Sequence, residues 1–412
     1  MENVNLYGEN KTQWYKFKLG EIISYKKGYA FKSENYRSTG IRIVKISDTT
    51  ESSIKLDNIT CIDAEKYNEY KEWALRENDI IISTVGSRPP LYDSMVGKVV
   101  KVPLSCNNAL LNQNMVRLRT TENVNQQYLY YLLKTRRYLN HIENICRGNA
   151  NQVSITLDEL FDYKIDVPPL EEQEKIVEIL STWDVAIEKQ EQLIEKKKEF
   201  KKGLMQRLFS GEVRFKEFKE EWFKSPISKI AKIGIGKTPD RKNNNYWGTG
   251  HKWLSIGDMR SKNILNTKEE ITQLAIEECN MKIVPKGTLV MSFKLTLGKV
   301  AILDEDMYTN EAICNFNVNK KIINRDYLYY YLDFIDVSKF GSRATKGITL
   351  NQETLSGIII KYPCLEEQDK IAETLISIDK EIELLEKELE ALKLQKKGLM
   401  QRLLTGEVRV KV

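Results

Sequence analysis

The sequence lacks any segment that would cross a membrane or direct export. Apolar runs such as residues 358–360 are far shorter than the roughly 20 residues that span a bilayer. The opening Met-Glu-Asn-Val-Asn has neither the basic region nor the apolar stretch of a signal peptide. The 6 cysteines stand alone, without a CxxC pair. We therefore expect reduced cysteines in a cytoplasmic protein that has no membrane segment.

Motifs for the usual catalytic centres are also missing. His141 and His251 are the only histidines, too few and too isolated for a metal site or a catalytic triad. Residues 234–238 lack the earlier glycine of a phosphate-binding loop, because position 231 is alanine, and they lack the third glycine of a dinucleotide fingerprint. No Asn/Asp-Pro-Pro-Tyr/Phe motif for adenine methylation is present, and residues 239–240 are not followed by the acid-x-Lys pattern of a nuclease. We expect a chain without chemistry or a cofactor of its own.

Composition allows a DNA partner without establishing one. The 412 residues suit two domains with connecting helices, and 41% hydrophobic residues are enough for real cores. The net charge of +6 is a mild basic excess, and the mean hydropathy of −0.45 is typical of a soluble chain. Such a charge permits a polyanionic partner.

What the chain does have is an internal duplication. Pro-Pro-Leu-Glu-Glu-Gln-Glu-Lys-Ile at residue 168 returns as Pro-Cys-Leu-Glu-Glu-Gln-Asp-Lys-Ile at residue 363, an offset of 363 − 168 = 195. At the same offset, Lys-Lys-Gly-Leu-Met-Gln-Arg-Leu begins at residues 201 and 396, and both copies go on to Gly-Glu-Val-Arg. Two such matches at one offset do not arise by chance.

Each copy has the heptad spacing of a coiled coil. In the second copy, apolar residues recur at 4-3 spacing from Ile371 to Leu403, with one polar break at Lys396. The seam of the first copy contains Trp183, Gln190 and two lysines, which makes it a poorer partner for itself. We therefore expect the first copy to pack on the second.

The ends of both helices and their direction follow from the chain. Each copy opens after proline with paired acids, at residues 171–172 and 366–367, which suit a helix N-terminus. Each closes before a glycine, Gly211 or Gly406, at a helix C′ position. A helix from residue 171 to 208 is roughly 57 Å long. Because the first helix leads into the second globular segment, pairing of the two helices requires them to run antiparallel, with one globular segment at each end.

The two globular segments, residues 13–167 and 221–362, show the same order of elements with different loops. Strand-like runs end at glycine or acidic turns, and a tyrosine-rich helix follows them in each segment. The matching stretches are 41–48 with 251–258, 78–86 with 286–294, 96–100 with 297–301, and 128–133 with 327–332. One scaffold with two different surfaces suits two related recognition tasks.

Over nearly its whole length the chain resembles the specificity subunit of type I restriction-modification systems. The resemblance rests on Pro-x-Leu-Glu-Glu-Gln-x-Lys-Ile and Gly-Leu-Met-Gln-Arg-Leu-x-x-Gly-Glu-Val-Arg, each present twice, and is supported by Gly28-Tyr-Ala-Phe-Lys-Ser and Gly236-Lys-Thr-Pro. It implies an α+β fold with two similar α/β target recognition domains at opposite ends of an antiparallel two-helix coiled coil, related by a pseudo-twofold internal repeat. The implied divisions are residues 1–167 and 212–362 for the recognition domains, and 168–211 and 363–412 for the conserved helices.

The same resemblance implies function and partners. Each recognition domain would read one half of a bipartite, asymmetric site in double-stranded DNA. The helices would set the spacer and bind two methyltransferase subunits, and motor-nuclease subunits would join for restriction. S-adenosylmethionine and ATP would be bound by those partners and not by this chain.

Base reading needs Arg or Lys for guanine, Asn or Gln for adenine, and Ser or Thr for either, whereas phosphate contacts need only positive charge or free N–H groups. Loop residues of these types are the candidate DNA contacts, and Tyr29 and Phe31 are aromatic residues that favour core packing over base stacking. The candidates in the first segment are Ser83, Thr84, Ser87, Arg88, Asn107, Asn108, Arg147, Asn149, Asn151 and Gln152; those in the second are Lys237, Thr238, Arg241, Lys242, Asn243, Asn244, Asn245, Lys294, Thr296, Arg343 and Lys346.

Three alternatives remain open from the sequence. Instead of a specificity subunit, the sequence could encode a methyltransferase or nuclease with unrecognised motifs. It could also encode a scaffold that does not bind DNA, or a free-standing structural coiled coil. Gly203 and Gly398, inside the helices, each cost about 1 kcal/mol against alanine. They indicate either the close approach of another helix, such as one from a methyltransferase, or fraying ends inherited by duplication.

Overall fold

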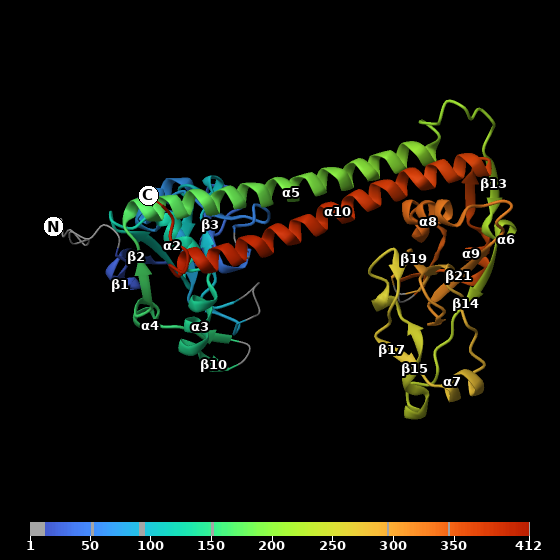
Figure 1. The fold of residues 1–412 in the computed structure, drawn as a ribbon, viewed down its shortest axis with the longest axis horizontal. Coiled ribbons are helices and arrows are strands. Elements are labelled where there is room, and N and C mark those ends of the chain that lie inside the picture. The colour runs from blue at the N-terminus through green and yellow to red at the C-terminus, as the bar shows by residue number, and fades with distance from the viewer. Residues whose placement is uncertain are drawn as a thin grey trace. The chain divides into compact units, whose positions relative to one another are not determined.

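The computed structural model describes residues 13–50, 53–89, 95–149, 152–294, 296–344 and 347–411 (Figure 1). The chain divides into two compact units. The first unit comprises Met1–Gln190 with Glu388–Val412, and the second comprises Glu191–Lys387. Within the described ranges, no helix is both long enough and apolar enough to cross a membrane.

The first unit is built on a four-stranded antiparallel sheet in the order β2-β9-β5-β7. Helix α2 (Gln126–Leu132) packs its tyrosines and leucines against one face of this sheet. A smaller sheet has the order β4-β3-β8. The strands are β2 (Ile23–Lys27), β9 (Met115–Thr120), β5 (Ile80–Ser83), β7 (Val99–Lys101), β3 (Ile41–Val44), β4 (Thr60–Ile62) and β8 (Leu110–Leu111).

Short elements complete the first unit. Strands β10, β11 and β6 form one small sheet, and β1 pairs with β12. The bounds are β1 (Tyr15–Lys18), β6 (Val85–Gly86), β10 (Arg147–Asn149), β11 (Gln152–Ser154), β12 (Lys164–Val167), α1 (Tyr67–Tyr70), α3 (Arg136–Ile145) and α4 (Leu157–Phe161).

The second unit repeats this plan. Its main sheet has the order β14-β21-β18-β19-β16, with helix α8 (Arg325–Phe334) in the position of α2. The other strands and helices are β13 (Phe223–Pro226), β14 (Ala231–Ile235), β15 (Trp247–Leu254), β16 (Asn263–Ile264), β17 (Glu269–Ile271), β18 (Leu289–Ser292), β19 (Val300–Leu303), β20 (Tyr308–Thr309), β21 (Ile313–Val318), β22 (Ser342–Ala344), β23 (Gly347–Thr349), β24 (Ile359–Tyr362), α6 (Ile227–Ile230), α7 (Gln273–Glu278) and α9 (Gln352–Gly357).

The central strand of each main sheet is buried on both faces, which explains its unbroken apolar run. In β5, Ile80 and Ile82 join the core beneath α2, whereas Ile81 joins a second core on the opposite face. In β18, Leu289 joins the core beneath α8, whereas Val290 joins a second core on the opposite face. The fold is mixed α/β in both units, as the sequence predicted.

The two long helices are α5 (Leu170–Ser210) and α10 (Leu365–Leu404). Both end where the sequence predicts, because Gly211 has φ +80° and Gly406 has φ +75°, the left-handed conformation that glycine adopts at C′. The heptad positions of both helices are buried or half-buried. A Cβ on Gly203 or Gly398 would have no atom within 4 Å, so neither glycine is explained by a close approach within the described chain.

The lysines in the helix seams form ion pairs and are not weak points. In the first unit, Lys396 of α10 binds Asp184 of α5, and the hydroxyl of Tyr131 donates to the same carboxylate at 2.5 Å. The second unit has the equivalent set. Lys201 of α5 lies 2.6 Å from Asp379 of α10, to which the hydroxyl of Tyr330 donates at 2.5 Å. Each lysine therefore binds a carboxylate of the other copy of the repeat.

The paired acids at the helix starts do more than face a helix N-terminus. Glu172 and Glu367, the second acid of each pair, are buried. Arg409, which closes the second copy, binds Glu172 through two nitrogens, each at 2.6 Å. Arg214, which closes the first copy, binds Glu367 at 3.0 and 2.6 Å. These bidentate pairs give the repeated Glu-Glu and Val-Arg motifs a shared structural role.

Candidate nucleic-acid interface

Both units have a glycine at the same place, directly after the first strand of the main sheet. The backbone of Gly28 donates to Met115, and a Cβ here would lie 1.9 Å from the carbonyl oxygen of Asn112. In the second unit, Gly236 donates to Ile313, and its Cβ would lie 2.2 Å from the carbonyl oxygen of Thr309. Only glycine fits either site, so the two glycine motifs of the sequence are one structural feature that places the loop after it.

In the first unit, the turn after β5 and the β10–β11 hairpin lie together. Strand β6 pairs with β11, which brings the segment around Ser87 next to Gln152. Arg88 and Gln152 are exposed, and Arg147 is exposed with its guanidinium 2.5 Å from Glu159. Asn149 ends β10. Asn151 lies outside the described residues.

The serine and threonine candidates of this turn are less accessible than the sequence suggested. Ser83, Thr84 and Ser87 are all buried. The Ser83 hydroxyl donates to the Met95 carbonyl at 2.7 Å and accepts from the Lys98 amide at 3.0 Å. This geometry gives Ser83 a role in shaping the turn, where a free base-reading hydroxyl was expected.

Asn107 and Asn108 lie away from that hairpin, on the turn before β8. Asn107 accepts from the backbone of Glu77 at 3.3 Å, and Asn108 accepts from the Tyr67 hydroxyl at 3.3 Å. Asn108 also has φ +66°, a turn conformation that asparagine tolerates. Both side chains are exposed but partly committed to the local fold.

In the second unit, the segment after β14 carries the first group of candidates. Lys237 donates to the Cys279 carbonyl at 2.7 Å, and Thr238 accepts from Asn310 at 3.2 Å. Arg241 forms a bidentate pair with Glu269, at 2.5 and 3.1 Å, and its guanidinium lies 3.8 Å from the Trp247 ring centroid. Lys242, Asn244 and Asn245 are exposed, and Asn243 caps a short turn by accepting from Asn245.

The second group of candidates surrounds the β18–β19 turn. Lys294 and Thr296 are exposed, and the Thr296 carbonyl accepts from the Ser292 hydroxyl at 2.5 Å. The amide of Leu350 donates to the carbonyl of Phe293, which brings the end of the β22–β23 hairpin to this turn. Arg343 lies within β22. Lys346 is outside the described residues.

The same surface therefore recurs in both units: a serine-closed turn after the central strand with a β-hairpin beside it. The sequence placed candidates in the turn and in the hairpin of each unit, but it did not show that these two segments lie side by side. The two aromatic residues for which the sequence favoured core packing differ in their burial. Phe31 is buried, but Tyr29 is 36% exposed and packs against Tyr70 and Trp73, with ring centroids 5.1 and 4.6 Å away. A small cavity of about 280 Å³ lies beside Tyr29, Phe31 and Tyr70.

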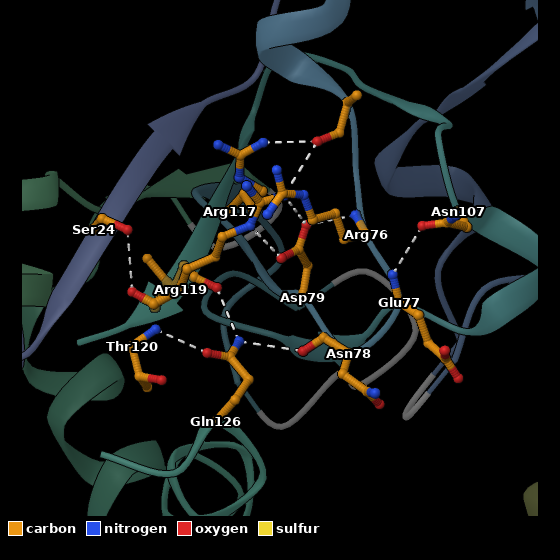
Figure 2. A network of polar contacts seen from close by, with 12 residues as sticks. Ser24, Arg76, Glu77, Asn78, Asp79, Asn107, Arg117, Arg119, Thr120 and Gln126 are labelled. Carbon is orange, nitrogen blue, oxygen red and sulfur yellow. Dashed lines mark hydrogen bonds and ion pairs between the residues drawn. The ribbon is translucent and has the colours of Figure 1, made fainter. Parts of the chain in front are cut away.

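A cluster of arginines in the first unit was not among the candidates. Figure 2 shows Asp79 between Arg119 and the backbone of Arg76. Arg117 donates to the carbonyl of Ala74 at 2.7 Å, and burial lowers the pKa of its guanidinium. Because these arginines bond to the chain itself, they hold the 72–79 segment in place. Their alternation along one strand is the signal that could have shown that they share a face.

Comparison with known proteins decides what this arrangement belongs to. The family model of the type I restriction modification DNA specificity domain matches twice, at residues 11–196 and 219–394. The chain belongs to the type I restriction-modification specificity subunit family. It is 29% identical to the MjaX specificity subunit of Methanocaldococcus jannaschii, over 98% of this chain and 96% of the relative.

Other relatives agree. The type I restriction enzyme MjaVIII specificity subunit of the same organism is 27% identical, over 97% of this chain and 93% of the relative. The crystal structure of the type I S subunit from M. genitalium shares the fold, with a TM-score of 0.55 at 17% identity, over 97% of this chain and 98% of that one. The expectations of a specificity subunit, and of a recognition subunit in place of an enzyme, are confirmed by the family.

Proposed function

We propose that the chain reads a bipartite, asymmetric site in double-stranded DNA, with one half read by each globular part. One observation carries this proposal: the specificity-domain family matches twice in one chain, and the two matched parts have equivalent scaffolds with different loops. Different loops on equivalent scaffolds favour two different half-sites, and hence asymmetry. The division into residues 1–167, 168–211, 212–362 and 363–412 is part of this proposal.

The proposal includes an antiparallel coiled coil of α5 and α10 that separates the two readers. In each unit, contacts between the two copies of the repeat pair low residue numbers with high ones. In the second unit, Lys201 meets Asp379 and Arg214 meets Glu367, so the partner number falls as the chain advances. In the first unit, Asp184 meets Lys396, and Glu172 meets Arg409. Opposed numbering within each unit supports opposed helix directions.

The candidate DNA contacts are the exposed members of the recurring turn-and-hairpin surface. In the first unit they are Arg88, Arg147 and Gln152, to which we add Asn149 and Asn151. In the second unit they are Lys294 and Thr296, to which we add Arg343 and Lys346. The loop after β14 adds Lys242, whereas Arg241 would have to leave Glu269 to reach a base.

Membership of the family supports the proposed partners. Two methyltransferase subunits would bind along the conserved helices and carry the S-adenosylmethionine, and motor-nuclease subunits with ATP would complete a restriction complex in the cytoplasm. Purified chain incubated with DNA and labelled S-adenosylmethionine tests this division of labour. Methyl transfer by this chain alone would contradict it.

The length of the helices provides the sharpest test. Two readers on one face of DNA sit about 34–36 Å or a multiple apart, and the 41 residues of α5 make a helix roughly 62 Å long. Removal of one heptad from α5 together with the matching heptad from α10 should shorten the unread spacer, because the seam register is kept. The recognised site of the assembled methyltransferase is mapped by sequencing methylated DNA. An unchanged spacer would refute the role of the helices as a ruler.

A further inference from the structure

The second unit contains a polar cavity of about 860 Å³ that the function described above does not use. It opens where the main sheet meets the first turns of α8 and α10. Its lining includes Lys286, Thr288, Asn317, Lys320 and Arg325. The volume is within the range of ligand sites, and the lining is polar, which favours a charged ligand over an apolar one.

An ion pair occupies the corresponding positions of the first unit. The registers Ile80 with Leu118 and Leu289 with Phe316 align the two sheets, so Asp79 and Arg119 correspond to Thr288 and Asn317. Arg119 forms a bidentate pair with Asp79, at 2.6 and 2.8 Å, as Figure 2 shows. In the second unit, both side chains of this pair are replaced by shorter, uncharged ones, which leaves the space open.

A second internal bridge is also replaced. In the first unit, Gln126 donates to the carbonyls of Asn78 and Leu118, at 3.2 and 3.0 Å (Figure 2). The residue after the equivalent helix cap is Arg325, which donates to the carbonyl of Gly287 at 3.2 Å. Its Nε is buried and has no hydrogen-bond partner among the described residues.

The charge of the cavity lining also differs from that of the corresponding positions in the first unit, and it is more positive. The cavity is lined by three cations, Lys286, Lys320 and Arg325, and by two acids, Asp326 and Asp369. The corresponding positions of the first unit carry three cations and four acids. Both cavity acids already have partners: Asp326 binds Arg325 at 2.8 Å, and Asp369 accepts from Asn324 at 2.6 Å. In the described part of the chain, the ammonium groups of Lys286 and Lys320 have no ion-pair partner.

We propose that this cavity binds a phosphate group, supplied either by a DNA strand or by a free nucleotide. Phosphate oxygens accept charge-assisted hydrogen bonds, and an arginine guanidinium with two lysines provides donors of the required kind. In the described part of the first unit, the Asp79–Arg119 pair stands at the corresponding positions, so the two halves of the protein would differ in this property. The DNA source rests on the proposed function, whereas binding of a free phosphate compound does not.

The test uses the full-length chain and inorganic pyrophosphate, with binding measured by calorimetry. The variant K320E/R325Q replaces both cations with the residue types that the corresponding segment of the first unit has at Glu122 and Gln126. We expect it to weaken pyrophosphate binding by roughly tenfold or more, because it removes two charge-assisted contacts. Lys282→Glu is the control for the charge reversal at position 320, since Lys282 is an exposed lysine of the same unit that does not line the cavity.

The DNA source is tested through salt dependence. Each phosphate contact contributes about 0.9 to the slope of log affinity against log salt concentration. If DNA supplies the phosphate, K320E/R325Q should reduce this slope by about one, and Lys282→Glu should leave it unchanged. If only pyrophosphate binding is lost, a free nucleotide is the source. A chain that binds pyrophosphate but no DNA would refute the proposed function and support the cavity as a phosphate site.

A second variant tests whether lost binding is only a consequence of lost folding. T288D/N317R transfers the ion pair of the first unit into the cavity and should abolish pyrophosphate binding without lowering the unfolding temperature. The inference is overturned if wild-type chain binds no pyrophosphate and neither variant changes the salt slope. It is also overturned if both variants impair only assembly with protein partners.

Discussion

The two units share a close backbone contact at one glycine, and they differ at the residue that follows it. Gly28 and Gly236 both bring the loop against a carbonyl that leaves no room for a side chain. The following residue is Tyr29 in the first unit, where it joins an aromatic cluster, and Lys237 in the second, where it donates to a carbonyl. The scaffold is therefore fixed by a backbone contact, and the exposed side chains beside it are free to differ between the two readers.

The units also differ in how completely buried polar groups are satisfied. Glu172 accepts from Arg409 and from the indole of Trp14 at 3.2 Å. Its counterpart Glu367 accepts from Arg214, while the indole nitrogen of Trp222 is buried without a hydrogen-bond partner in the described chain. Both units keep the pair between arginine and the buried glutamate, but only the first keeps the hydrogen bond from tryptophan. The same substitution in the two units should therefore change the free energy of unfolding by different amounts.

The largest effect is expected at the shared glycines. Gly28→Ala and Gly236→Ala would each place a methyl group within 2.2 Å of a carbonyl oxygen, so the backbone has to move. We expect each to lower the free energy of unfolding by about 3 kcal/mol. Calorimetry should show that each substitution lowers the melting transition of its own unit more than that of the other.

Gly203→Ala is the matched control for these substitutions. Nothing lies within 4 Å of its Cβ, so alanine should stabilise the helix by about 1 kcal/mol. A neutral Gly28→Ala would show that the contact with Asn112 does not restrict this turn.

An effect of equal or smaller size is expected at the arginines that bind the buried glutamates. Arg214→Ala leaves Glu367, whose side chain is 1% exposed, without its partner and should cost about 3 kcal/mol. Arg409→Ala should cost about half as much, because Glu172 keeps the bond from Trp14 and Arg409 is itself 44% exposed. Urea unfolding of both variants measures the difference.

Trp14→Phe removes the additional donor and should bring the effect of Arg409→Ala close to that of Arg214→Ala. Equal costs in the presence of Trp14 would mean that the indole contributes nothing to holding the carboxylate.

Much of the fold could be predicted because it depends on local and repeated patterns in the sequence. The heptads give α5 and α10, and the glycines after them mark their ends at Gly211 and Gly406. The buried strands β5 and β18 follow from their apolar runs. These features depend on neighbouring residues, which a sequence displays directly.

Contacts between distant residues could not be predicted in the same way. Lys201 and Lys396 looked like breaks in the seam because their partners, Asp379 and Asp184, lie more than 170 residues away in sequence. Ser83 looked like a base reader, although its hydroxyl closes a turn. A residue type alone does not show whether its polar group is already bonded, so the candidate site was the less predictable part.

The smallest expected effect concerns an asparagine that both units place after the same short strand. The side-chain amide of Asn310 donates to the Thr238 hydroxyl at 3.2 Å. In the first unit, Asn112 is 6% exposed and its amide nitrogen has no partner in the described chain, because position 30, which corresponds to Thr238, is alanine. Ala30→Thr should therefore stabilise the first unit by about 1 kcal/mol, and Thr238→Ala should destabilise the second by a similar amount.

Thr238→Ser keeps the hydroxyl and serves as the control, with little change expected in the unfolding temperature. Ala30 is exposed, so a threonine side chain has room there and need not disturb the core. If Ala30→Thr were destabilising while Thr238→Ala behaved as expected, the two turns would differ in backbone geometry as well as in sequence. The correspondence between the units would then hold for the sheets and the glycines but would end at the loops that follow them.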